Sequence, residues 1–308
     1  MELLAEVERS GLVESRHYGL AVAVGPDGDV RDAVGDPETV VFGRSANKPV
    51  QAMGMLAAGL GLAGEQLALA AASHMGEERQ TAVVSSILAD VGLDESALRC
   101  PEAYPDDGRE HARVLRAGGR KSRLTMGCSG KHAAMLATCV HAGWPIEDYL
   151  DPAHPLQRQI AATFAELTGA EASATGVDGC GAPVLATTLR RLAWAVGRIA
   201  RADTPASAAL VAAVRAHPEL VSGVRRSERH LVTGLPGALA KSGAEGLMVV
   251  GLPDGSGFAV KVADGTERPL YVATARLLER SGHVVAIPDG APAVTGGGRV
   301  VGEVRAAF

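Results

Sequence analysis

The chain has 308 residues, of which 47% are hydrophobic and 21% charged, as in an ordinary globular protein with a sizeable core. Its net charge is −5 and only 3% of its residues are aromatic, which argues against the basic and base-stacking surfaces of nucleic-acid-binding proteins. No run of about 18 uncharged apolar residues predicts a membrane span. The first residues, MELLAEVERSG, lack the basic and apolar regions of a secretory signal, so we expect a cytoplasmic protein.

The N-terminal part of the chain predicts strands followed by helices. Residues 17–42 have the apolar runs and the PDGD turn of a β-meander. Apolar spacing predicts a helix from about residue 50, with Pro49 in its first turn. Residues 64–92 predict two helices with a break at Ser73–Gly76.

The rest of the chain predicts more helices and then strands. Residues 101–109 predict a loop, and later patterns predict helices at about 109–117, from about Gly127, at 154–170, at 182–216 and at 267–281. A hairpin is predicted for GLMVVGLPDGSGFAVKVADG and a last strand for VVGEVRAAF. This order predicts one α+β domain over residues 1–308, with a sheet from residues ~17–42 and ~246–308 and a helical region at ~45–216.

A serine and a lysine lie three residues apart in the segment GRSANKP, as Ser45 and Lys48. On a helix this spacing places both side chains on one face, so the amine can reach the hydroxyl. Serine becomes a good nucleophile when an adjacent base takes its proton, and a neutral lysine can be that base. Because lysine titrates near about 10.4, burial or a second cation must lower its pKa. Such S-x-x-K pairs are typical of β-lactamases and penicillin-binding proteins, although the pattern also arises by chance.

Two more residues are candidates for the same chemistry. Lys261 lies within the predicted strand FAVKVADG, where small residues flank it; it is either a functional cation or a solvated lysine of an edge strand. Ser73 lies at the predicted helix break. It is either a proton relay or second nucleophile, or the cap of a helix that begins near Glu77.

Cysteines mark a second group of candidate residues. The segment MGCSGKH places Cys128 on one helix face with Lys131 and His132, and VDGCGAPV places Cys180 in a Gly-rich turn before a predicted helix with Pro183 in its first turn. With Asp178, the two cysteines and the histidine could form a zinc site. The alternative is a pair of buried free thiols at helix starts. We interpret the remaining cysteines, Cys100 and Cys139, as structural.

Six segments in order, GRSANKPVQ, ASHMGE, MGCSGKHAAML, VDGCGAPV, AKSGAEG and AVKVADGTERP, resemble the class 3 L-asparaginases, also called the asparaginase II family. This group lacks the threonine nucleophile of the other asparaginases. The resemblance extends from about residue 18 to residue 308. It implies a serine β-lactamase-like fold, with a mainly antiparallel sheet packed with helices, and a homodimer.

The resemblance also implies roles for individual residues. Ser45 matches the first catalytic serine with Lys48 as its base, and Ser73 and Lys261 match the second serine and its lysine. The segment AKSGAEG also resembles the Lys-Ser/Thr-Gly strand of β-lactamase-like enzymes, which makes Lys241 an alternative to Lys261. The family's zinc site corresponds to Cys128, Lys131 and Cys180, with lysine in place of the histidine that spacing favoured. The residues then expected to contact substrate are Asp178, His132 and Arg44.

We therefore expect a hydrolase that converts L-asparagine to aspartate and ammonia, with zinc as a probable cofactor. Ser45 would attack the side-chain amide carbon, and backbone N–H groups at helix starts would stabilise the oxyanion. One alternative is a penicillin-recognising enzyme with the same Ser–Lys pair, although the S-D-N triplet is absent. Another is a different Ser–Lys amidohydrolase, such as a glutaminase. A third, of another class, is a zinc- or thiol-based sensor without turnover.

Overall fold

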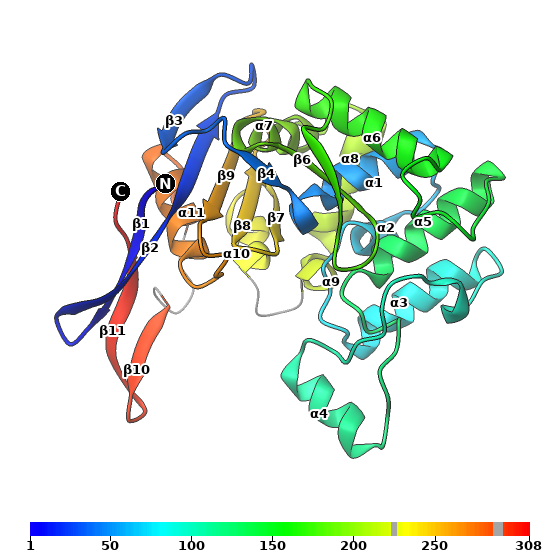
Figure 1. The fold of residues 1–308 in the computed structure, drawn as a ribbon, viewed down its shortest axis with the longest axis horizontal. Helices are drawn as coiled ribbons and strands as arrows, with labels where there is room; N and C mark the ends of the chain where they lie inside the picture. Colours follow the sequence, from blue (N-terminus) through cyan, green and yellow to red (C-terminus); the bar gives the residue numbers. More distant parts are fainter. Residues whose placement is uncertain (223–226, 286–291) are drawn as a thin grey trace. The chain divides into compact units, whose positions relative to one another are not determined.

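The computed structural model describes residues 1–222, 227–285 and 292–308 (Figure 1). Its elements form two units, each of which draws on separate stretches of the chain. The first unit comprises Met1–Ala46, Thr187–Arg201 and His230–Phe308, and the second comprises Asn47–Ala186 and Ala202–Arg229. In the described ranges, no helix has both the length and the apolar character needed to cross a membrane.

The first unit is built on an eight-stranded sheet in the order β10-β11-β1-β2-β9-β8-β7, with β3 paired to β2 (Figure 1). Neighbouring strands in this sheet run antiparallel. The strands of the unit are β1 (Glu2–Arg9), β2 (Leu12–Val24), β3 (Val30–Val34), β4 (Val40–Phe42), β7 (Leu239–Gly243), β8 (Leu247–Gly251), β9 (Gly257–Val262), β10 (Ala293–Gly296) and β11 (Arg299–Ala306). The two ends of the chain thus complete one sheet.

Helices cover both faces of the central strands. Both α7 (Leu189–Ala200) and α11 (Leu270–Arg280) pack on β2 and β9. Consecutive residues from Leu20 to Val24 are all buried. Because successive residues of a strand point to opposite faces, this burial requires cover on both sides. Gly251 and Gly257 let the backbone of α7 approach the sheet, since a Cβ atom at either position would overlap a carbonyl oxygen of that helix.

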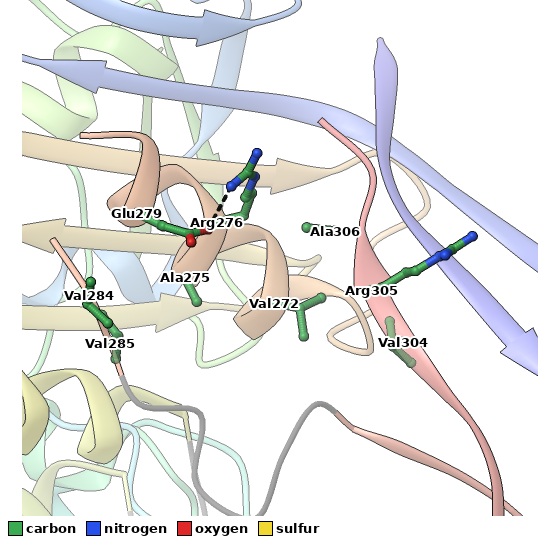
Figure 2. Close-up of a pocket in the computed structure, with 9 residues that line it drawn as sticks. All are labelled: Val272, Ala275, Arg276, Glu279, Val284, Val285, Val304, Arg305 and Ala306. Carbon is green, nitrogen blue, oxygen red and sulfur yellow. Dashed lines mark hydrogen bonds and ion pairs between the residues drawn. The ribbon is translucent and has the colours of Figure 1, made fainter. Parts of the chain in front are cut away.

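A cavity of about 290 Å³ lies beside α11 in the first unit (Figure 2). Arg276 and Glu279, which share a hydrogen bond of 2.7 Å, are among its lining side chains. The other lining residues are Val272, Ala275, Val284, Val285, Val304, Arg305 and Ala306. The residues predicted to form the functional site do not line this cavity.

The second unit is mainly helical, and α5 is its most buried element. All residues of α5 from Ser129 to Cys139 are buried, and this helix packs against α2 and α3, while α1 packs against α6. Gly130 allows the close approach to α2, because a Cβ atom there would lie 2.6 Å from the oxygen of Leu69. The helices are α1 (Lys48–Ala57), α2 (Gly64–Ala70), α3 (Glu78–Ala89), α4 (Gly108–Arg116), α5 (Ser129–Ala142), α6 (Pro155–Thr168), α8 (Pro205–Ala216) and α9 (Pro218–Ser222), and α10 (Ser227–Gly234) follows.

The structure confirms the predicted α+β class and the mainly antiparallel sheet, and it corrects one segment. Residues 182–216 are not helical throughout, because Pro183–Thr188 form strand β6 before α7 and α8 begin. This strand pairs antiparallel with β5 (Ala174–Val177). Pro183 therefore begins a strand and does not lie in a first helical turn. The sheet also includes β1 and β7, which lie outside the ranges predicted for it.

Candidate active site

Lys48 is the first residue of α1, and its side chain is 1% exposed. Pro49, in the first turn as predicted, fixes the start of the helix. The amine contacts three oxygen atoms: the carbonyl oxygen of Ala72, the hydroxyl oxygen of Ser73 at 3.0 Å and the carbonyl oxygen of Gly127 at 3.5 Å. These oxygens come from the segment between α2 and α3 and from the loop before α5. A buried amine is thus held where two loops meet.

Ser73 lies in the break between α2 and α3 and is half-buried. Its N–H donates to the carbonyl oxygen of Val221 at 2.9 Å. The alternative that Ser73 caps the next helix is wrong, because the N-cap of α3 is Glu77, which forms a reciprocal capping box with Gln80. The hydroxyl of Ser73 is therefore used at Lys48 and not at a helix end.

Ser45 belongs to the first unit, whereas Lys48 belongs to the second. Ser45 is half-buried in a 3₁₀ turn, η1 (Arg44–Asn47), that directly precedes α1. The preceding residue, Arg44, has a φ of 46°, in the left-handed region that few non-glycine residues adopt. The contact that the S-x-x-K spacing predicts between Ser45 and the Lys48 amine stays a prediction.

The two lysines of the first unit differ in their surroundings. Lys261 lies on β9, which pairs with both β2 and β8, so the alternative of an edge strand is wrong. Its half-buried amine donates to the carbonyl oxygens of Glu245 at 2.7 Å and Val262 at 2.6 Å. Burial lowers the pKa of Lys261, against the opposing charges of Glu245 and Asp264.

Lys241, the alternative to Lys261, is 1% exposed on β7. Its amine donates to the carbonyl oxygen of Ser242 at 2.8 Å. Gly243 lies two residues further on, and a Cβ atom there would lie 3.1 Å from the backbone nitrogen of Ala46. The strand that carries Lys241 thus packs directly against the turn that carries Ser45.

Cys128 and Cys180 lie together in the second unit, although they are far apart in the sequence. All four cysteines are free and buried. The thiols of Cys128 and Cys180 share a hydrogen bond, and the Lys131 amine, which is 1% exposed, donates to the Cys180 sulfur at 3.3 Å. The structure thus brings together the two sulfurs and the lysine nitrogen of the predicted metal site.

Charges in this cluster shift the pKa values of its members. The hydrogen bond from Cys180 lowers the pKa of Cys128 well below its ordinary value, and the charges of Lys48 and Lys131 add to this effect. The same hydrogen bond raises the pKa of Cys180, and burial raises it further. Burial would lower the pKa of Lys131, but the charges of Cys180, Cys128 and Asp178 outweigh it and raise this pKa. The two thiols therefore share one proton, with the negative charge on Cys128.

The donor set fits a thiophilic metal ion of low coordination number. Zinc prefers thiolate sulfur and nitrogen ligands in a tetrahedral arrangement, and this cluster offers two sulfurs and one nitrogen. Among the residues that the structure describes, no three His, Cys, Asp or Glu side chains gather as in an ordinary metal site. A metal held here would therefore need Lys131 as its third protein ligand.

His132 is fully buried beside this cluster. Its Nδ1 lies 2.7 Å from the hydroxyl of Tyr149, which accepts a hydrogen bond from the N–H of Arg99 at 3.0 Å. The tyrosine hydroxyl therefore donates to Nδ1, and the proton of the neutral ring lies on Nε2. Burial lowers the pKa of His132 well below its ordinary value, and the charges of Lys131 and Lys48 act in the same direction. Sequence reasoning missed Tyr149, because an isolated tyrosine in a loop carries no signal of this contact.

Asp178 lies just before the turn that carries Cys180. It is half-buried, and its carboxylate accepts a hydrogen bond from the N–H of Gly179 at 2.8 Å. The N–H of Gly181 donates to the carbonyl oxygen of Asp178 at 2.8 Å, and Gly181 has a φ of 86°, which favours glycine. The turn thus fixes Asp178 and Cys180 relative to one another.

Residues 5–306 of the chain match the family L-asparaginase II. The chain belongs to the L-asparaginase II family. The resemblance predicted from the sequence is confirmed, and this member of the family is an amidohydrolase of the asparaginase type that acts on a small molecule. No curated protein sequence matches the chain.

Two solved structures match this asparaginase II family member with low scores. A β-lactamase from Mycobacterium bovis shares 15% identity over 85% of this chain and 93% of its own, with a TM-score of 0.40. A β-lactamase from Desulfarculus baarsii shares 16% identity over 87% of this chain and 93% of its own, with a TM-score of 0.37. Both titles name the fold class expected from the sequence. Scores this low carry no argument about the substrate.

Proposed function

We propose that this chain hydrolyses the side-chain amide of L-asparagine to aspartate and ammonia, with Lys48 as the base that activates a serine hydroxyl. The observation that supports the proposal is the buried Lys48 amine in contact with three oxygen atoms. A neutral amine has two N–H donors and one lone pair. Two carbonyl oxygens, those of Ala72 and Gly127, can accept the two protons, which leaves the lone pair to accept the hydroxyl proton of Ser73. The arrangement therefore suits an amine that acts as a base.

The reaction proceeds through an ester on the enzyme. A serine Oγ attacks the amide carbon, its proton passes to Lys48, and the carbon–nitrogen bond breaks as ammonia leaves with a proton. Water then cleaves the ester, which releases aspartate and restores the hydroxyl. We assign the ester to Ser45, the partner of Lys48 in the S-x-x-K motif, and assign to Ser73 the role of holding the amine. The 3.0 Å contact of Ser73 with Lys48 makes Ser73 the second candidate for acylation.

The second lysine of the catalytic group is Lys261 or Lys241. Its positive charge would favour the neutral form of Lys48. The resemblance favours Lys261, whereas the packing of the Lys241 strand against the turn of Ser45 favours Lys241. Replacement of each by Met distinguishes them, because only the lysine that acts in catalysis should lower the rate strongly when it is removed.

Zinc is part of the proposal, with Cys128, Lys131 and Cys180 as its protein ligands. When bound, zinc would supply a positive charge that orients the amino or carboxylate group of a free amino acid. Asp178 suits the α-ammonium group, Arg44 suits the α-carboxylate, and the Nε2–H of His132 is a further donor. These groups would select a small zwitterion over a peptide.

The experiment measures ammonia release from L-asparagine and L-glutamine by the wild type, Ser45→Ala and Ser73→Ala. Ser173→Ala, which removes an exposed serine of the second unit, is the control. We expect asparagine to be cleaved faster than glutamine, and we expect no turnover with Ser45→Ala.

A diazo-ketone analogue of asparagine identifies the reactive serine, because it labels the nucleophile covalently. Peptide mapping of the labelled protein should place the adduct on Ser45. An adduct on Ser73 would reverse the roles of the two serines but keep Lys48 as the base. An enzyme that cleaves neither amide and takes up no label would overturn the proposal.

A further inference from the structure

His74 lies between the two segments that surround the Lys48 amine. One segment supplies the oxygens of Ala72 and Ser73, and the other supplies the oxygen of Gly127. His74 directly follows Ser73 in the chain, and its side chain is 1% exposed. Its backbone N–H donates to the oxygen of Gly127 at 3.1 Å, the same oxygen that the Lys48 amine contacts.

The imidazole ring of His74 forms a second connection between the same segments. The N–H of Gly76 donates to Nδ1 at 3.1 Å, so the proton of the neutral ring lies on Nε2. Nε2 lies 2.8 Å from the hydroxyl of Ser129, and this hydroxyl lies 2.8 Å from the carbonyl oxygen of Leu124. A single set of proton positions satisfies the whole chain: Nε2–H donates to Ser129, and Ser129 donates to Leu124.

The backbone on either side of His74 has little room to move. Gly76 has a φ of 77°, and a Cβ atom there would lie 2.9 Å from both the Cα of Pro105 and the oxygen of Thr125. A Cβ atom on Gly127 would lie 2.9 Å from the oxygen of His74. The two segments therefore pack backbone against backbone, and His74 holds them with both its main chain and its side chain.

We propose that His74 is a positioning residue, which fixes the Ser73 segment against the Gly127 segment and so keeps the Lys48 amine in contact with the Ser73 hydroxyl. This inference rests on the proposed function, because it concerns the same lysine and serine. Ser129 completes the device, since it accepts the Nε2 proton and ties it to the loop before α5. Neither residue contacts the Lys48 amine through its side chain in the hydrogen bonds described above, so both act through the loops.

The test compares Ser129→Ala, His74→Asn and the double variant with the wild type. Ser129→Ala removes only the side-chain connection and leaves the bond between His74 and Gly76. Asparagine at position 74 can still accept the N–H of Gly76, as in an Asx turn, but it is too short to reach Ser129. A misplacement of about 1 Å can cost on the order of 100-fold in rate, so we expect kcat to fall by about 10–100-fold with KM little changed.

Two further results separate positioning from a loss of stability. The double variant should lose no more rate than the slower single variant, because both changes break one connection. Thr138→Val is the matched control, since it removes another buried hydroxyl from α5, one that donates to Ala134. This control should leave kcat at the wild-type value even where it lowers the melting temperature.

Covalent labelling by a fluorophosphonate gives a readout that does not depend on the amide substrate. The labelling rate of the serine should fall in Ser129→Ala and His74→Asn as kcat does. If the wild type is labelled but releases no ammonia, the substrate proposal fails, and slower labelling of the variants still supports the role of His74. Wild-type kcat and labelling rates in both variants would overturn the inference, as would additive losses in the double variant. A wild type that is neither labelled nor active would overturn both.

Discussion

The buried imidazole of His74 predicts a specific dependence of stability on pH. Burial, aided by the positive charge of Lys48, lowers the pKa of His74 from its ordinary value to about 3. In the unfolded chain, histidine titrates near about 6.5. The unfolded chain therefore takes up a proton at this residue at a higher pH than the folded protein does. The contribution of neutral His74 to stability is complete above a pH of about 6.5 and is lost as the pH falls towards 3.

The size of this loss follows from the two pKa values. Between them, one histidine lowers the free energy of unfolding by about 1.4 kcal/mol for each pH unit. Over the range from pH 7 to pH 5, the sum is about 2 kcal/mol, because the loss begins only near the unfolded pKa. This is a large part of the ~5–15 kcal/mol by which folded proteins are stable.

Urea unfolding at pH 7, 6 and 5 measures this effect in the wild type, His74→Asn and His141→Asn. His141, an exposed residue of α5, controls for the loss of one histidine. The stability advantage of the wild type over His74→Asn should shrink by about 2 kcal/mol between pH 7 and pH 5. The difference between the wild type and His141→Asn should change much less. Parallel pH profiles for the wild type and His74→Asn would refute the reasoning.

Other predictions concern the metal site, the packing of α5 and the assembly. Cys128→Ser and Cys180→Ser should each abolish zinc binding, measured by elemental analysis of purified protein; undiminished zinc would exclude these ligands. Gly130→Ala should lower the free energy of unfolding by about 1–3 kcal/mol, because its Cβ atom would meet a carbonyl oxygen of α2. Gly108→Ala, where no atom lies within 4 Å, is its control. Light scattering should give twice the 31.5 kDa of one chain, and a mass of one chain would rule out the homodimer.

Local patterns in the sequence were enough to predict most of the helices and the C-terminal hairpin. Helices α1 to α6 begin and end near the predicted positions, since apolar spacing, Pro at helix starts and Gly at helix ends are local signals. Strand β6 was missed because Pro183–Thr188 becomes a strand only by pairing with β5, and an apolar, Ala-containing run also suits a helix. Strand β1 was missed for a related reason, since its pairing with β11 joins opposite ends of the chain.

The site shows the same division between local and long-range information. The S-x-x-K motif singled out Lys48, but no local signal indicates that its amine meets Ser73 and the oxygen of Gly127. Spacing favoured histidine as a zinc ligand, whereas the structure places the amine of Lys131 beside Cys180. Contacts between distant segments depend on how the loops pack, and a single sequence does not encode that packing in a readable pattern.

The most direct test of the central claim is ammonia release from L-asparagine by the wild type and Lys48→Met, measured side by side. Methionine keeps much of the length of the side chain and removes the base, so the rate should fall by about 10²–10⁴-fold, the usual contribution of a positioned base. Wild-type protein should release one ammonia for each aspartate formed. No release by the wild type, or an equal rate in Lys48→Met, would contradict the account.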